Sequence, residues 1–151
     1  MIKIVNYEEK YRTVFRDINV EWISHYFKME AEDYKYLEHP KENILDKGGA
    51  ILVALMDEEP IGVCALVKMS EEKYELAKMG VKPVARGKKI GWLLGQAIIK
   101  RAKEMNAISL FLESNRVLTP AISLYRKLGF EEVVGGSSPY ARCDIQMEKK
   151  L

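Results

Sequence analysis

Residues 81–96 read Val-Lys-Pro-Val-Ala-Arg-Gly-Lys-Lys-Ile-Gly-Trp-Leu-Leu-Gly-Gln, a pattern that predicts the end of a strand, a basic loop and the start of a helix. Two glycines and three cations lie within the six residues from Arg86 to Gly91. A helix N-terminus carries unpaired backbone N–H groups and about half a positive charge. Glycine lets the backbone approach a ligand closely. The loop therefore predicts a site for a phosphorylated ligand, although an ordinary solvated turn has the same composition.

The loop lacks the two most familiar phosphate-binding patterns. No Gly-Lys-Ser/Thr follows at P-loop spacing, and no Gly-x-Gly-x-x-Gly follows the strand as in dinucleotide-binding folds. The loop resembles motif A of the GNAT family of N-acetyltransferases, Gln/Arg-x-x-Gly-x-Gly/Ala. Arg86 and Gly91 match the first and last positions, whereas Lys89 stands where the family usually has its middle glycine. A side chain there is harmless if φ is negative and costly if φ is positive.

A second motif lies nearer the C-terminus. Residues 121–130 read Ala-Ile-Ser-Leu-Tyr-Arg-Lys-Leu-Gly-Phe, and Asn115 precedes them. They resemble motif B of the same family, in which Asn and Ala precede Leu-Tyr-x-Lys-x-Gly-Phe. Part of this pattern is also that of any amphipathic helix with a glycine after its end. Two motifs in the right order are more specific than one. The resemblance covers residues 50–150 well, and the first 45 residues only through the order of predicted elements.

The hydrophobic periodicity predicts an alternation of strands and helices that agrees with this resemblance. The strand 108–113 is apolar and is expected to be buried on both faces, as a central parallel strand would be. Thr119 is the predicted N-cap of the last helix, and Gly129 is its predicted C-cap. Strands are predicted at 1–5, 50–56, 61–69, 74–81, 108–113, 130–134 and 142–148, and helices at 7–27, 30–45, 88–106 and 120–128. Within 30–45, Pro40 is expected to start a new turn.

The expected fold class is α/β (α+β), with a mixed, mostly antiparallel central sheet of about six to seven strands and helices on both faces. This is the GNAT-like acyl-CoA acyltransferase fold. The chain has 151 residues, of which 48% are apolar, so residues 1–151 are predicted to be a single globular domain, which the resemblance implies is an N-acetyltransferase domain. The formal net charge is +2 and the basic residues are local, which argues against a nucleic-acid partner.

The composition also indicates where in the cell the protein is expected and whether it is expected to bind a metal. No apolar run approaches the roughly 20 residues of a membrane span, and the N-terminus has no signal-peptide pattern. A cytoplasmic protein without membrane association is therefore expected. Two cysteines and two histidines make no metal-ligand cluster, so no metal is expected. Cys64 and Cys143 lie in apolar segments and are expected to be buried and reduced. His25 and His39 are interpreted as surface residues.

The resemblance implies that acetyl-CoA is the co-substrate. Backbone N–H groups from Arg86 to Gly91 would hold its pyrophosphate, with Trp92 at the start of the helix. Backbone groups of the preceding strand would pair with the pantetheine arm, and Gly80 would ease a bulge that opens a slot for the thioester. The residues implied to bind acetyl-CoA are Met79, Gly80, Val81, Arg86, Gly87, Lys88, Lys89, Ile90, Gly91, Trp92, Asn115 and Tyr125.

Acetyl transfer to an amine needs a neutral amine, a polarised carbonyl and a protonated leaving group. Tyr125 matches the general acid of the family, because a phenol of pKa near 10 can protonate a thiolate of pKa near 8.5; packing on the ligand is the alternative. Glu75 matches a glutamate that some members use as base, the alternatives being a solvent-facing carboxylate and deprotonation through water. Asn115 matches a residue that often contacts CoA, or caps the next turn.

The resemblance places the first two helices and the loop 137–142 near the acceptor. Arg142 is a hypothesis for a residue that binds an acceptor carboxylate, with an ordinary surface role as the alternative. One or two aromatic residues of the first helices are expected to line the acceptor pocket and the rest to pack in the core; these residues are Trp22, Tyr26, Phe27 and Tyr34.

The leading function is an acetyl-CoA-dependent N-acetyltransferase that acts on the amine of a small molecule by direct attack in a ternary complex. An amino acid or other carboxylated amine is included among the acceptors. A protein lysine or N-terminal acetyltransferase is the alternative within this class, and a non-catalytic acyl-CoA-binding or sensing module is the alternative outside it. The exposed last hairpin is also compatible with a homodimer.

Overall fold

A computed structural model describes residues 1–151, and its strands form one seven-stranded sheet in the order β1-β2-β3-β4-β5-β7-β6. β4 and β5 are parallel, and all other neighbouring strands are antiparallel. The predicted mixed, mostly antiparallel sheet is therefore confirmed. The strands are β1 (Ile2–Asn6), β2 (Ala50–Met56), β3 (Glu59–Lys68), β4 (Lys73–Val81), β5 (Ser109–Ser114), β6 (Glu131–Val133) and β7 (Ile145–Lys150).

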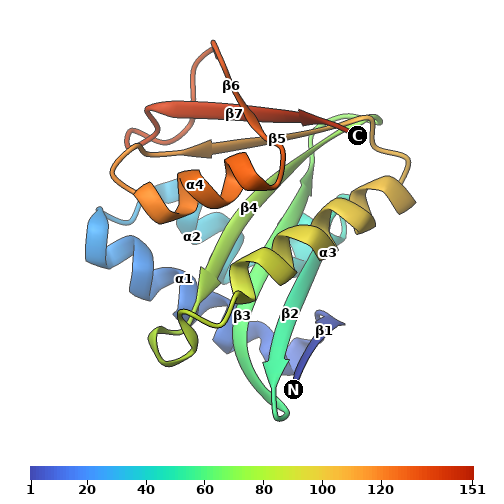
Figure 1. The fold of residues 1–151 in the computed structure, drawn as a ribbon, viewed down its shortest axis with the longest axis vertical. Helices are drawn as coiled ribbons and strands as arrows, with labels where there is room; N and C mark the ends of the chain where they lie inside the picture. Colours follow the sequence, from blue (N-terminus) through green and yellow to red (C-terminus); the bar gives the residue numbers. More distant parts are fainter.

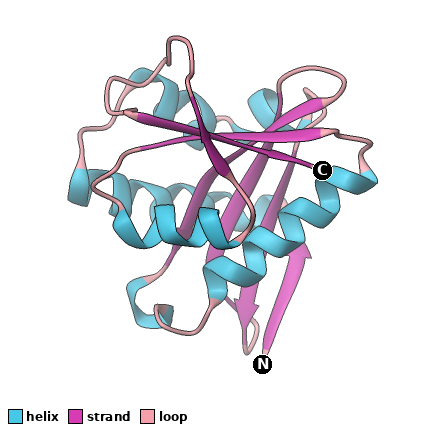
Figure 2. Ribbon diagram, turned by 45° about the horizontal axis from the view of Figure 1, so that its top comes forward, coloured by secondary structure: helices cyan, strands magenta, loops and turns pink.

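The α-helices cover both faces of this sheet, as predicted. α1 and α2 lie on one face, and α3 and α4 lie on the other (Figures 1 and 2). The helices are α1 (Arg12–Tyr26), α2 (Ala31–Glu38), α3 (Ile90–Glu104) and α4 (Thr119–Lys127), with 3-10 turns at Glu9–Tyr11 and Pro83–Ala85 and a π-helical turn at Lys41–Leu45.

The central strands bury side chains on both faces. Successive residues of a strand point to opposite faces, so Ile51 and Val53 join the core beneath α1, whereas Leu52 and Ala54 join the core beneath α3. This explains why β2 and residues 60–67 of β3 are apolar without interruption. Phe15 of α1 is fully buried in the first of these cores.

β4 and β5 are paired over only part of their length. Lys73–Glu75 pairs with Ser109–Phe111, and the strands then separate, so Leu76–Val81 has no strand neighbour on the β5 side. β4 has a bulge in the part that pairs with β3 but not with β5. There Lys78 has a φ of +53° and the register against β3 shifts. The separation opens a space between the two strands.

Gly80 does not carry this bulge, which differs from the prediction. The residue of β4 with positive φ is Lys78. A Cβ on Gly80 would lie 2.7 Å from Cγ2 of Ile18 and 2.9 Å from Cδ1 of Trp22. The missing side chain of Gly80 therefore allows α1 to pack closely on β4.

The prediction that the 108–113 strand is buried on both faces is wrong. Leu110 and Leu112 of β5 are buried, whereas Phe111 and Glu113 are partly exposed. Burial alternates along β5, so one face of the strand is buried and the other is partly open.

Three helix boundaries also bear on the predictions. α4 begins at Thr119 with Leu118 as N-cap, so Thr119 is not the cap. Gly129 has a φ of +101° just after α4, which confirms the predicted C-cap. The helical segment 30–45 is divided at His39, whose backbone leaves the helical region, and a separate turn follows Pro40, as predicted. A residue that precedes proline disfavours the helical conformation, which accounts for the break.

Candidate active site

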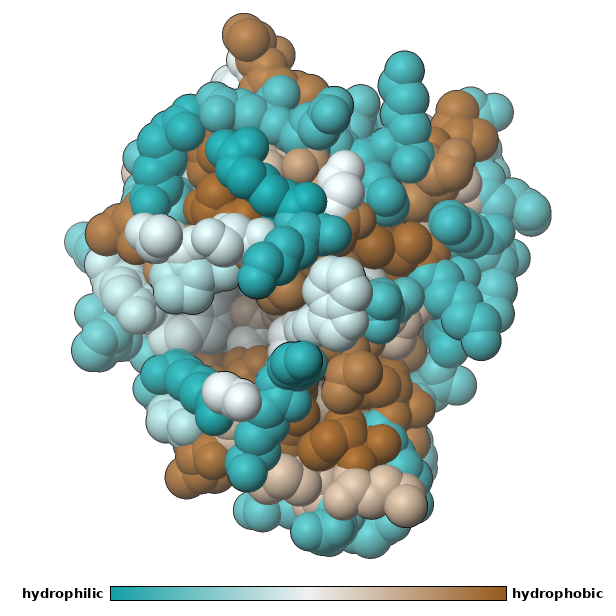
Figure 3. Space-filling view, viewed as in Figure 1, coloured by the Kyte–Doolittle hydropathy of each residue, from teal (hydrophilic) through white to brown (hydrophobic).

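A cavity of about 580 Å³ opens where β4 and β5 separate. Figure 3 shows it as a hollow left of centre, between α4 and the loop before α3. Most of the predicted site residues line it. They are Glu75, Met79, Gly80, Val81, Arg86, Gly87, Lys89, Ile90, Gly91, Asn115 and Tyr125.

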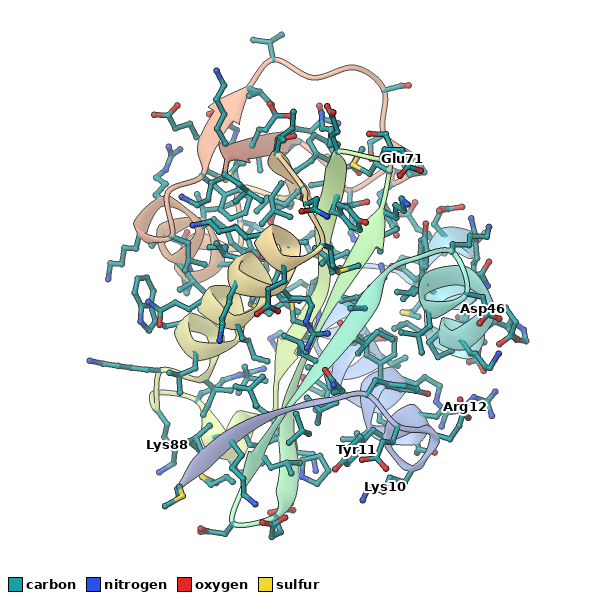
Figure 4. The ribbon with its side chains drawn as sticks, turned by 90° about the vertical axis from the view of Figure 1, so that its right-hand side faces the viewer. Lys10, Tyr11, Arg12, Asp46, Glu71 and Lys88 are labelled. Atoms are coloured by element: carbon teal, nitrogen blue, oxygen red, sulfur yellow. The ribbon has the colours of Figure 1, made fainter.

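Lys88 and Trp92 do not line this cavity. Lys88 is exposed on the outer side of the loop before α3 (Figure 4). Trp92 is half-buried against the core beneath α3. Each residue turns a helix by about 100°, so the start of α3 presents Ile90 and Gly91 to the cavity and turns Trp92 away.

The loop before α3 offers a run of unpaired backbone donors. The N–H groups from Gly87 to Trp92 have no acceptor in the protein, and α3 has no side-chain N-cap. The N–H of Arg86, which was predicted to contact the pyrophosphate, instead donates to the Pro83 carbonyl at 3.2 Å. Consecutive free N–H groups at a helix start can surround an anion.

The departure from the family motif at Lys89 has a structural cost. Lys89 has a φ of +62° and lies in the left-handed region, as Gly87 does with a φ of +82°. A non-glycine residue in this region costs about 1 kcal/mol. A strained lysine therefore stands where the motif has glycine, and its side chain adds positive charge to the cavity.

Glu75 lies at the last residue of β4 that pairs with β5 and lines the cavity. No hydrogen bond or ion pair holds its carboxylate. Burial, followed by the charge of Glu113, raises the pKa of Glu75 to about 7. A carboxylate with this pKa is suited to accept a proton near neutral pH.

Tyr125 projects from α4 into the same cavity. Its ring packs edge-on against Phe130, with ring centres 6.1 Å apart. Burial raises the pKa of the Tyr125 hydroxyl, and the nearby Cys64 thiol adds to this effect. The hydroxyl therefore keeps its proton over the working range of pH and can donate it.

A buried ion network closes one end of the cavity. Asp33 of α2 is fully buried and accepts bonds from Arg142 at 2.6 and 2.7 Å and from Lys78 at 2.7 Å. Burial alone would raise the pKa of Asp33, but the bonds from Arg142 and the charge of Lys78 lower it to about 2. Arg142 also reaches Glu30 at 3.3 Å, and Lys78 donates to the Tyr140 hydroxyl at 3.0 Å. Two cations are thus balanced by two carboxylates.

This network overturns the predicted role of Arg142. Both terminal nitrogens of its guanidinium are bonded to Asp33, so Arg142 has no free charge for an acceptor carboxylate. β7 begins at Ile145 rather than at the predicted residue 142, so Arg142 lies in the loop before the strand.

Sequence reasoning missed Asp33 and Lys78, and with them the partners that make this network. Lys78 and Asp33 are 45 positions apart, and Arg142 and Asp33 are 109 apart. The one local signal is the capping box of Glu30 and Asp33, which predicts a helix start but not a partner. Glu113 and Tyr140 were missed as well, although both line the cavity.

Asn115 has a structural role that matches its predicted alternative. Its Nδ2 donates to the Arg142 carbonyl at 2.7 Å, and its Oδ1 accepts from the Val117 N–H at 2.8 Å. Cys64 is fully buried, as predicted, whereas Cys143 is only half-buried and lines the cavity; both are free thiols.

Aromatic residues of the N-terminal helices divide between the cavity and the surface. Trp22, Tyr26 and Phe27 line the cavity, whereas Tyr34 is half-exposed and lies outside it. Neither His25 nor His39 lines the cavity.

A membrane span and a metal site each require particular features of the helices and of the metal-binding side chains. None of its helices combines the length and the apolar character needed to cross a membrane. No group of three or more His, Cys, Asp or Glu side chains is arranged to hold a metal ion.

The profile of the acetyltransferase (GNAT) family matches residues 13–130. The chain belongs to this family. One GNAT relative is the uncharacterized N-acetyltransferase YjgM of Escherichia coli (strain K12), 32% identical over 92 residues. The match covers 60% of this chain and 55% of YjgM, so the chain spans about half the length of that curated relative.

Solved GNAT structures share the fold. An acetyltransferase of the GNAT family from Staphylococcus aureus Mu50 has a TM-score of 0.90, with 23% identity and 99% of both chains covered. A GNAT superfamily phosphinothricin acetyltransferase from Sinorhizobium meliloti, solved in complex with acetyl-CoA, has a TM-score of 0.81 and 18% identity. The match covers 99% of this chain and 88% of that protein. At these identities the likeness concerns the fold alone.

Proposed function

We propose that residues 1–151 form one domain that transfers the acetyl group of acetyl-CoA to the amine of a small molecule. The observation that carries this proposal is that one cavity joins three features. These are the free N–H groups of the loop before α3, of which Gly87, Lys89, Ile90 and Gly91 line the cavity, the carboxylate of Glu75 and the hydroxyl of Tyr125. An anion site, a base and an acid are the groups that acetyl transfer from a CoA thioester needs.

The residues around the loop and β4 fit acetyl-CoA as a ligand. The N–H groups of Gly87–Trp92 would hold the pyrophosphate, with the side chains of Arg86 and Lys89 adding positive charge. The part of β4 that β5 leaves unpaired, Leu76–Val81, would bind the pantetheine arm as an added strand. Its amides at Met79–Val81 would polarise the thioester carbonyl.

In the catalytic step, one side chain accepts a proton and another donates one. Glu75 accepts a proton from the ammonium of the acceptor, which frees the nitrogen lone pair. The nitrogen forms a bond to the acetyl carbonyl carbon, and the carbon–sulfur bond of acetyl-CoA breaks. Tyr125 gives its proton to the departing sulfur, and the second amine proton returns to the phenolate through solvent. The products are the N-acetyl amine and CoA.

Assays of acetyl-CoA binding and of thiol release distinguish this function from two others. A non-catalytic acyl-CoA-binding module would bind acetyl-CoA without amine-dependent release of thiol. A protein lysine or N-terminal acetyltransferase would act on peptides and leave small amines unchanged. The state of the Glu75 carboxylate favours an enzyme. It has no bonded partner, and its pKa stays raised because the charge of Lys78 only partly offsets burial and Glu113. Such a carboxylate is suited to accept a proton, which a pure binding site does not need.

Replacing Tyr125 by phenylalanine tests the assignment of the acid. We expect kcat for amine acetylation to fall by about 100-fold, because the leaving thiolate loses its proton donor. The measurement is thiol release from acetyl-CoA in the presence of a panel of small amines, together with calorimetric binding of acetyl-CoA.

The matched control is Tyr34→Phe, which removes a hydroxyl from a half-exposed tyrosine outside the cavity. We expect this variant to keep wild-type kcat. An unchanged kcat in Tyr125→Phe would mean that Tyr125 only packs against the ligand.

A further inference from the structure

The acceptor end of the cavity has no cation available for an anionic substrate. Arg142 and Lys78 are the cations there, and Asp33 binds both at 2.6–2.7 Å. Glu30 adds a second negative charge at 3.3 Å from Arg142. The side chains of Asp33 and Lys78 are almost completely buried, so the network is a fixed part of the wall. Its net charge is zero.

Two carboxylates at the same end have no cation bound to them. Glu75 makes no hydrogen bond or ion pair, and it lies close enough to Glu113 for the two charges to repel. Glu113 accepts bonds from neutral donors only, the Ser138 hydroxyl and the Gln146 amide. Both carboxylates line the cavity. A cation brought by a ligand would relieve their repulsion.

Aromatic rings form the remaining wall of this end. Trp22 and Phe27 line the cavity from the side of α1, and Tyr140 lines it from the loop before β7. Aromatic faces bind apolar groups and attract cations. The faces of Tyr140 are already used by Arg142 and Lys78, each 4.6 Å from the ring centre, whereas no cation is stacked on Trp22.

We infer that the acceptor is a primary amine that binds as an ammonium ion between Glu75 and Glu113, has an apolar or aromatic body and carries no carboxylate. This inference rests on the proposed function and names its substrate class. A carboxylated amine would place its negative charge beside two carboxylates and beside cations that are already neutralised. The structure therefore replaces the expectation of an amino acid acceptor with that of an amine without a carboxylate.

The test compares amines that differ only in the carboxylate. The pairs are tyramine and tyrosine, tryptamine and tryptophan, and phenethylamine and phenylalanine, assayed by thiol release from acetyl-CoA. We expect kcat/KM to favour the amine without carboxylate by about tenfold or more in each pair, since like charges are strongly disfavoured at a buried site. Tyrosinamide, which has the size of tyrosine but no carboxylate charge, is expected to approach tyramine.

The variant Glu113→Gln tests the role of the second carboxylate. We expect KM for tyramine to rise by about tenfold, the preference for tyramine over tyrosine to narrow, and acetyl-CoA affinity to stay the same. A purely structural role of Glu113 would leave the preference unchanged. The control is Glu131→Gln, which removes an exposed carboxylate of β6 far from the cavity lining.

The outcomes separate this inference from the proposed function. Equal or faster acetylation of tyrosine would overturn the inference and keep the acetyltransferase. Binding of acetyl-CoA without turnover of any amine in the panel would also overturn the acceptor class. Failure to bind acetyl-CoA would overturn the proposed function itself.

Discussion

Glu75→Gln is expected to lower kcat/KM for the amine by about 100-fold, because the acceptor ammonium loses the group that takes its proton. The wild-type kcat/KM should rise with pH through an inflection near 7, the pKa to which burial and Glu113 raise Glu75. The variant should lose this inflection. The measurement is the pH profile of kcat/KM between pH 5.5 and 9, with about ten values of pH for each protein.

The same substitution should stabilise the folded protein at alkaline pH. The pKa of Glu75 is about 7 in the fold and near 4.5 in an ordinary environment. As pH rises through this window the unfolded chain ionises first, so the folded state loses about 3 kcal/mol by pH 8. Glutamine cannot ionise and avoids the loss, so Glu75→Gln should unfold at higher urea concentration than wild type at pH 8 and not at pH 4.

A variant that keeps both wild-type kcat/KM and the inflection near pH 7 would contradict the assignment of Glu75 as base. It would favour deprotonation through water. Glu148→Gln provides the control, because Glu148 pairs with Lys73 at 2.7 Å on the same sheet outside the cavity lining.

The second large effect concerns stability and arises at Asp33. Asp33→Asn should lower the free energy of unfolding by about 3–5 kcal/mol at pH 7, since it leaves Lys78 and Arg142 buried without a full countercharge. The measurement is urea unfolding followed by circular dichroism. Because the pKa of Asp33 is lowered to about 2, its contribution is complete above pH 4 and is lost as pH falls through 2.

Asp57→Asn is the matched control for this prediction. Asp57 is 84% exposed and pairs only with the N-terminal amine, so we expect a change below about 0.5 kcal/mol. A loss below about 1 kcal/mol in Asp33→Asn would show that water reaches the network and that it does not hold α2 against β4.

The element types of this chain follow from local patterns. Residues 50–56 are apolar at every position, which predicted a strand, and β2 has these bounds. Gly129 after a helical pattern predicted the end of α4. These signals act over a few residues, so they are visible without knowledge of the fold.

The failures come from interactions between distant segments. Whether the second face of β5 is covered depends on elements distant in the sequence, and no property of residues 108–113 reveals that this face is partly open. Arg142 was read as a free cation because its partner, Asp33, is 109 positions away. Lys89 is the intermediate case, since the motif identified the position and only the structure shows that its φ is positive.

The most direct test of the account is calorimetric titration of acetyl-CoA into wild type, Arg86→Ala/Lys89→Ala and Lys100→Ala. Arg86 and Lys89 line the cavity, whereas Lys100 is an exposed cation farther along α3 and outside the lining. The account predicts micromolar binding by wild type and by Lys100→Ala, and binding at least tenfold weaker, by about 1.4 kcal/mol, in the double variant. Absence of binding by wild type would contradict the account, because the loop before α3 would then be only a basic surface turn.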